Sequence, residues 1–104
     1  MPDVFSGGTY HEVERWIRNF LTVHAKRVDP RFEIALDAED EREGKSFGVR
    51  LRLGQRLGSL LEIDFRETAD NRGSLAWCGA LAERIRRAAR ELLADRTTAD
   101  VRPH

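Results

Sequence analysis

The spacing of the apolar residues changes twice along the chain, and these changes limit the folds that it can adopt. From residue 9 to 28, apolar residues recur at intervals of three and four, which is typical of an amphipathic helix. From residue 32 to 66 they alternate with polar residues, as in strands that bury one face. From residue 75 the helical spacing returns. We therefore expect the element order α-β-β-β-α.

The first helix has a start signal and a stop signal. Thr9 followed by Glu12 matches a capping box, in which both side chains bond to free backbone N–H groups at a helix start. Pro30 prevents the helix from continuing. One side of this helix carries its apolar residues together with a histidine: Val13, Trp16, Ile17, Phe20, Leu21, His24 and Val28.

The three strands are predicted in "RFEIALD", "VRLRL" and "LEIDFR". A polar loop, "AEDEREGKS", joins the first two, and the short "GQRLGS" joins the second and third. Strands joined in this way pair with their sequence neighbours in antiparallel fashion. The fold class is therefore α+β, a three-stranded antiparallel meander, with "VRLRL" as its middle strand.

"ETADNRGS" is predicted to be a turn-rich break before the second helix. That helix should end near Asp95, and its apolar face is formed by Leu75, Cys78, Leu81, Ala82, Ile85, Ala88, Ala89, Leu92 and Leu93. Two amphipathic helices suffice to cover the one apolar face of the sheet. We expect a flexible lead over residues 1–8, one domain over residues 9–95 and a disordered tail over residues 96–104.

Composition excludes several classes of function. The 18 basic and 18 acidic residues give a net charge of zero, so nucleic acid or anionic lipid would have to bind through a local patch. No signal-peptide pattern and no membrane-length apolar run is present, which predicts a cytoplasmic protein without a membrane partner. The single cysteine and the lack of zinc-type spacing predict neither a disulfide nor a metal or other cofactor.

The middle strand carries Arg50 and Arg52 on the sheet face that the helices leave open. Such a basic strand is a candidate partner-binding surface. Alternation places acidic residues of both outer strands on the same face: Glu33, Asp37, Glu62 and Asp64. We expect the two arginines to pair with these carboxylates, which favours a mixed-charge face over a phosphate site.

The loop "DAEDEREG" is a second candidate, because Glu39, Asp40, Glu41 and Glu43 would be exposed at a hairpin tip. Arg42 stands where a calcium-binding EF-hand requires glycine, so the loop does not match that site. We expect a solvated tip that can contact a basic partner.

The second helix holds the densest basic group: Arg84, Arg86, Arg87 and Arg90. The last three share the outer side of a helical wheel, which makes this group the best candidate for a nucleic-acid contact. The alternative is a solvated helix face whose cations favour the C-terminal end of the helix dipole.

The same helix has a side of small residues, comprising Ala76, Gly79 and Ala80 with Glu83. A glycine inside a helix costs about 1 kcal/mol relative to alanine, so a close approach by another backbone would account for it. Self-association through this side and tight packing against the first helix are both consistent with the pattern.

Cys78 and His24 are interpreted as residues of the core or its rim. A buried thiol has little nucleophilic thiolate, and no acidic residue that would orient His24 is identifiable. The chain is therefore not expected to be an enzyme.

With both helices on one sheet face, this order resembles the double-stranded RNA-binding domain over residues 9–95. That family binds RNA largely through lysines at the start of its second helix, after a glycine and a serine. Gly73 and Ser74 match that start, whereas positions 75–79 contain no lysine. The same order also opens larger secretion-chaperone-like folds, which bind protein segments.

Two separated charge blocks suggest docking to another protein. Residues 29–43 contain seven acids and two arginines, whereas residues 84–90 contain four arginines and no acid. We expect a non-catalytic protein-interaction domain, adaptor or chaperone-like, that also forms a homodimer. The alternative is an RNA-binding module that uses the arginines of the second helix.

Overall fold

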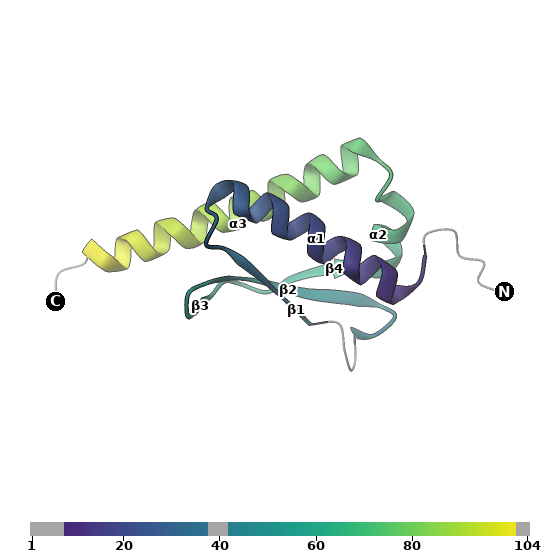
Figure 1. Ribbon diagram of the computed structural model, residues 1–104, viewed down its shortest axis with the longest axis horizontal. Coiled ribbons are helices and arrows are strands. Elements are labelled where there is room, and N and C mark those ends of the chain that lie inside the picture. Colours follow the sequence, from purple (N-terminus) through teal and green to yellow (C-terminus); the bar gives the residue numbers. More distant parts are fainter. Residues whose placement is uncertain (1–7, 38–41, 102–104) are drawn as a thin grey trace.

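The computed structural model describes residues 8–37 and 42–101, and for residues 95–101 it describes the backbone alone. Two long helices lie side by side over one face of an antiparallel sheet (Figure 1), which confirms the expected α+β fold. The elements in chain order are α1 (Tyr10–Val28), β1 (Glu33–Asp37), β2 (Ser46–Leu53), β3 (Arg56–Leu57), β4 (Leu61–Asp64), α2 (Phe65–Asn71) and α3 (Leu75–Val101).

Helix α1 begins with the predicted capping box. The Thr9 hydroxyl accepts a hydrogen bond from the backbone N–H of Glu12 at 3.1 Å, and the Glu12 carboxylate accepts one from the Thr9 N–H at 3.0 Å. The helix ends at Val28, directly before Asp29 and Pro30. Its buried residues face the sheet and α3.

Strand β2 is the middle strand, as the alternating pattern predicted. It pairs antiparallel with β1 on one side and with both β3 and β4 on the other. The segment "GQRLGS", predicted as a loop, contains the short strand β3, and a bulge separates β3 from β4, which begins at the predicted third strand. Residues 50 and 51 lie opposite residues 58–60, so the pairing register shifts by one residue between β3 and β4.

A second correction concerns the segment after β4. The strand ends at Asp64, and α2 begins at Phe65 where a strand end and a turn-rich break were predicted. The Asp64 carboxylate accepts a hydrogen bond from the Glu67 N–H at 2.8 Å and so caps α2. Asp64 satisfies the strand alternation and also serves as a helix cap, which is why the pattern misplaced the boundary.

Helix α3 also differs from its prediction at both ends. Leu75 was assigned to the apolar face, yet it is 91% exposed at the first residue of the helix. At the other end the helix runs to Val101 rather than ending near Asp95. No glycine or proline lies between these two residues to end it.

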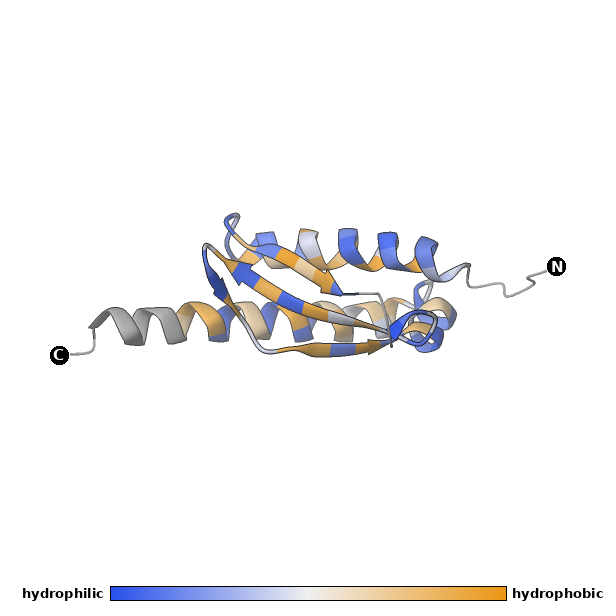
Figure 2. Ribbon diagram, turned by 90° about the horizontal axis from the view of Figure 1, so that it is seen from below, coloured by the Kyte–Doolittle hydropathy of each residue, from blue (hydrophilic) through white to orange (hydrophobic). Residues whose placement is uncertain are grey.

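The core lies between the helices and the sheet. The aromatic residues Phe32 and Phe47 are fully buried there, together with Ile17, Leu21 and Ile85. Hydrophobic and hydrophilic residues alternate along β2 where the sheet is seen in front of the helices (Figure 2). No described helix is long and apolar enough to cross a membrane.

Candidate functional site

The open face of the sheet contains one of the two expected arginine pairs. Arg52 lies across from Glu33, with 3.1 Å between Nε and Oε1, which confirms that pairing. The expectation for Arg50 was wrong. Its guanidinium donates to the carbonyl oxygen of Gly58 at 3.0 Å, and the residue opposite it on β1 is Ala35.

Arg42, from the loop before β2, makes the bonds to carboxylates of both outer strands that were predicted for Arg50. Gly48 lies between Asp37 and Glu62 in the sheet register, and the Arg42 guanidinium lies where a Gly48 side chain would be. It bonds to Asp37 at 3.1 Å and to Glu62 at 3.1 and 3.2 Å. Hydrogen bonds from Ser46 and from Arg42 lower the pKa of the Glu62 carboxyl below its usual value. The mixed-charge face is therefore largely self-compensated.

Of the four candidate acids in the loop before β2, the structure describes Glu43. Glu39, Asp40 and Glu41 lie outside the described residues, so their predicted role remains a prediction. Glu43 is exposed in the turn before β2.

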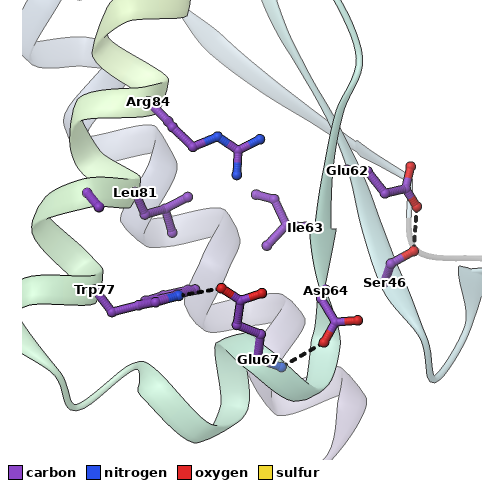
Figure 3. Close-up of a pocket in the computed structure, with 9 residues that line it drawn as sticks. Ser46, Glu62, Ile63, Asp64, Glu67, Trp77, Leu81 and Arg84 are labelled. Atoms are coloured by element: carbon purple, nitrogen blue, oxygen red, sulfur yellow. Dashed lines mark hydrogen bonds between the residues drawn. The ribbon is translucent and has the colours of Figure 1, made fainter.

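The four arginines of α3 differ in their partners and in the direction of their side chains. Arg86 and Arg90 both bond to the Glu83 carboxylate, at 3.3 and 3.0 Å, and these bonds hold the pKa of Glu83 below its usual value. Arg87 is exposed. Arg84 extends from α3 toward β4 (Figure 3). These residues therefore do not form one uncompensated basic patch.

Cys78 and His24 have separate surroundings. The half-buried thiol of Cys78 donates to the carbonyl oxygen of Arg72 at 3.4 Å. His24 Nδ1 lies 3.2 Å from Nη1 of Arg86, and burial together with Arg27 and Arg86 lowers the pKa of His24. Among the described residues, the groups acting on the imidazole are the cations Arg27 and Arg86, and no acidic side chain bonds to His24 to orient it as a general base.

The small-residue side of α3 is exposed. Ala76, Gly79 and Ala80 face outward, and a Cβ added at Gly79 would meet no atom within 4 Å. Tight packing against α1 therefore does not account for Gly79, which removes one of its two explanations. Self-association remains a prediction.

The sequence did not predict a pair of surface hollows that lie beside α3. Two hollows of about 360 and about 310 Å³ lie end to end between α3 and the β3–β4 edge. We call them together the α3–β4 groove. The first is lined by Ser46, Glu62, Ile63, Asp64, Glu67, Trp77, Ala80, Leu81 and Arg84, and the second by Leu51, Leu57, Gly58, Ser59, Leu61, Ala88, Glu91 and Leu92.

One side of α3 forms the helical wall of this groove. Trp77, Ala80, Arg84, Ala88 and Glu91 follow one another at intervals of three or four residues, so they share one helix face. The bottom of the first hollow is formed by two buried side chains, Leu81 of α3 and Ile63 of β4. This spacing is visible in the sequence, but its opposition to β4 depends on how the two elements pack.

The sheet wall of the groove has an unpaired backbone edge. Among the described residues β4 pairs with β2 alone. The N–H of Phe65 bonds to the carbonyl of Lys45, so the alternation of an antiparallel ladder directs the backbone groups of Ile63 and Leu61 toward β2. The N–H and C=O of Glu62 therefore point outward, away from β2.

Acidic side chains gather at the α2 end of the groove. The indole N–H of Trp77 donates to Oε2 of Glu67 at 2.9 Å, and Asp64 lies at the start of the same helix (Figure 3). Neither carboxylate has an ion pair within the described parts of the chain, and the cation that lines this hollow is Arg84.

Comparison with known proteins does not assign this site. No family model matches the chain, and neither the curated proteins nor the solved structures contain a match. The functional interpretation therefore rests on the geometry of the chain itself.

Proposed function

We propose that the protein is a non-catalytic protein-binding domain that holds a segment of another protein in the α3–β4 groove. The observation that carries this proposal is the edge of β4, which has no described strand partner and lies beside a face of α3 with both apolar and charged side chains. An exposed strand edge offers a row of backbone donors and acceptors to an incoming chain. The adjacent apolar side chains supply the surface that such a chain buries.

The charge distribution supports a protein partner over a nucleic acid. Arg52 and Arg42 contact carboxylates on the open face, and Arg86 and Arg90 share Glu83. Binding to phosphates depends on cations that release counterions, and a paired guanidinium has fewer free donors. The RNA-binding alternative depends chiefly on Arg84 and Arg87, and it predicts affinity that falls steeply with salt.

The expected homodimer remains part of the proposal. Its contact would be the exposed side of α3 around Ala76 and Gly79, where small side chains permit close approach of a second helix. Sedimentation at several concentrations, with Gly79→Gln as the test variant, distinguishes this contact from the groove. A monomer at all concentrations would remove self-association and leave the groove proposal intact.

Affinity capture from a native lysate tests the main proposal. The wild-type chain is compared with Ala80→Arg, which places a large side chain in the groove at an exposed position, and each capture is repeated with nuclease. Ala94→Arg is the matched control, since it makes the same exchange at an exposed α3 position beyond the groove.

We expect nuclease-resistant protein partners with the wild type and with Ala94→Arg, and their loss with Ala80→Arg. Partners that disappear on nuclease treatment would favour the RNA-binding alternative. Equal capture by Ala80→Arg would contradict docking in the groove.

A further inference from the structure

We infer that the occupant of the α3–β4 groove is an extended segment of a different protein, with alternating basic and apolar residues, that adds to the sheet beside β4. This inference rests on the proposed function and specifies its ligand. Three features of the groove determine it, namely the backbone edge, the apolar side and the acidic side.

The backbone edge selects an extended conformation. The outward N–H and C=O of Glu62 match the spacing of a neighbouring strand, which supplies one acceptor and one donor every second residue. A helix has its own backbone groups already bonded and cannot use this edge. An added strand also places successive side chains on opposite faces of the sheet.

The side of the added strand toward the helices meets apolar surface. Leu61 and Ile63 of β4 point to this side, and Ala80 and Ala88 of α3 are exposed or half-buried along it. Residues of the partner at every second position would cover these groups and exclude water from them. Apolar side chains are therefore required at those positions.

The alternate positions of the added strand meet carboxylates. Glu62 and Asp64 are exposed on the open face of β4, and Glu67 lies at the α2 end of the groove. Arg42 compensates Glu62, whereas Asp64 and Glu67 have no ion pair within residues 8–37 and 42–94. Basic side chains opposite Glu62 and Asp64 gain cross-strand attraction, and one near the α2 end is attracted to Glu67, whereas acidic side chains are repelled.

The same charges argue against a second copy of the chain as the occupant. Antiparallel pairing of β4 with β4 of another copy would bring Glu62 and Asp64 near the same two residues of the copy. Like charges on directly opposed strand positions are destabilising. The edge is thus suited to a basic partner strand and protected from self-pairing.

The inference is tested with short blocked peptides in three series, in which alternate positions are Lys, Thr or Glu and the others are Val or Leu. Binding to the full chain is followed by NMR shifts of the backbone amides and by the salt dependence of affinity. The variants are Ala80→Arg, Glu67→Gln and the control Ala94→Arg. Glu67→Gln removes the charge while its amide oxygen still accepts the Trp77 hydrogen bond.

We expect the Lys series to bind most tightly and to shift amides of β4 and of the α3 wall. Ala80→Arg should weaken binding by about tenfold or more, and Glu67→Gln by about two- to fivefold, as for one partly exposed charge pair. Ala94→Arg should bind as the wild type does.

Equal binding of the Thr or Glu series in the groove would overturn the basic-partner inference and leave the proposed function standing. Failure of the Lys series to shift the groove amides would overturn strand addition. If groove-dependent capture also failed, the proposed function would fall with it. Dimerisation that persists in Gly79→Gln but is abolished by Ala80→Arg would instead identify a second copy as the occupant of the groove.

Discussion

The indole Nε1 of Trp77 on α3 lies 2.9 Å from Oε2 of Glu67 on α2, and this hydrogen bond joins the two helices at one end of the groove. It fixes the orientation of the largest groove side chain. It also holds the Glu67 carboxylate beside the mouth of the groove, where the side chain stays exposed. The short helix between β4 and α3 thus contributes to the docking surface as well as connecting its walls.

The first prediction concerns this hydrogen bond. Glu67→Ala should lower the free energy of unfolding by about 1 kcal/mol, because the Trp77 N–H loses its acceptor. Glu67→Gln should cost less, since the amide oxygen can still accept. Denaturant unfolding measures both, and Glu91→Ala, at an exposed groove position without a described hydrogen bond, serves as the control. Equal losses for Glu67→Ala and Glu67→Gln would show that the charge, not the hydrogen bond, matters.

The second prediction is a coupling between Gly48 and Arg42. In the wild type, the Cβ introduced by Gly48→Ala would lie 2.7 Å from Nε of Arg42 and would displace the guanidinium from Asp37 and Glu62. In an Arg42→Ala background this conflict is absent, and alanine should gain about 0.5 to 1 kcal/mol over glycine within a strand. A double-mutant cycle by denaturant unfolding should therefore show clear non-additivity. Additive effects would mean that Arg42 does not occupy the space over Gly48.

The third prediction concerns Tyr10, the single tyrosine of the chain. Its hydroxyl donates to the Ser46 carbonyl. Burial, and to a lesser extent the nearby carboxylates, raises the pKa of Tyr10 from 10.0 to about 12. The folded state holds this proton more tightly than the unfolded chain does. The stability contributed by Tyr10 is therefore fully present below pH 10 and declines as the pH rises toward 12.

Ultraviolet absorbance of tyrosinate measures this pKa, because no other residue gives that signal. The folded chain should titrate well above the denatured chain, and Tyr10→Phe should reduce the loss of stability between pH 10 and 12. A folded-state titration at the denatured value would contradict the burial of this hydroxyl.

The fourth prediction concerns His24, whose pKa is lowered by burial and then by Arg27 and Arg86. Because the folded state favours the neutral imidazole, the stability from His24 is present above its unfolded pKa near 6.5 and is lost as the pH falls through the lower folded pKa. Arg86→Gln should move the pKa of His24 upward toward its usual value. NMR titration of the imidazole protons follows this shift, and an unchanged pKa would mean that Arg86 does not act on the ring.

The helix and strand pattern was predictable from local sequence, whereas some boundaries were not. Thr9 and Glu12 mark the start of α1 by local chemistry alone, and the structure confirms it. Asp64 is both the last residue of β4 and the cap of α2, so the alternation that it fits does not show that the strand ends there. Leu75 fits the periodic pattern of α3, yet it is exposed at the first residue of the helix, where the pattern does not show that the packed part begins later.

The open-face pairs show the same limit. Arg52 and Glu33 were predictable because the β1–β2 register places them opposite each other. Arg50 was not, since the chain turns back after β2 in a register that places Glu62 opposite Gly48 and Asp64 opposite Ser46, away from Arg50. The groove was beyond local patterns altogether. It arises because α3 packs against α1, while within residues 8–37 and 42–101 no strand pairs with the outer edge of β4.

Amide hydrogen exchange at Glu62, with and without a Lys-series peptide, tests strand addition most directly. In the free protein, the Ile63 amide should be protected by its bond to β2, whereas the Glu62 amide should exchange rapidly. Peptide binding should slow exchange at Glu62 and leave Ile63 little changed. Protection of Glu62 in the free protein, or an unchanged rate in the bound state, would contradict the account.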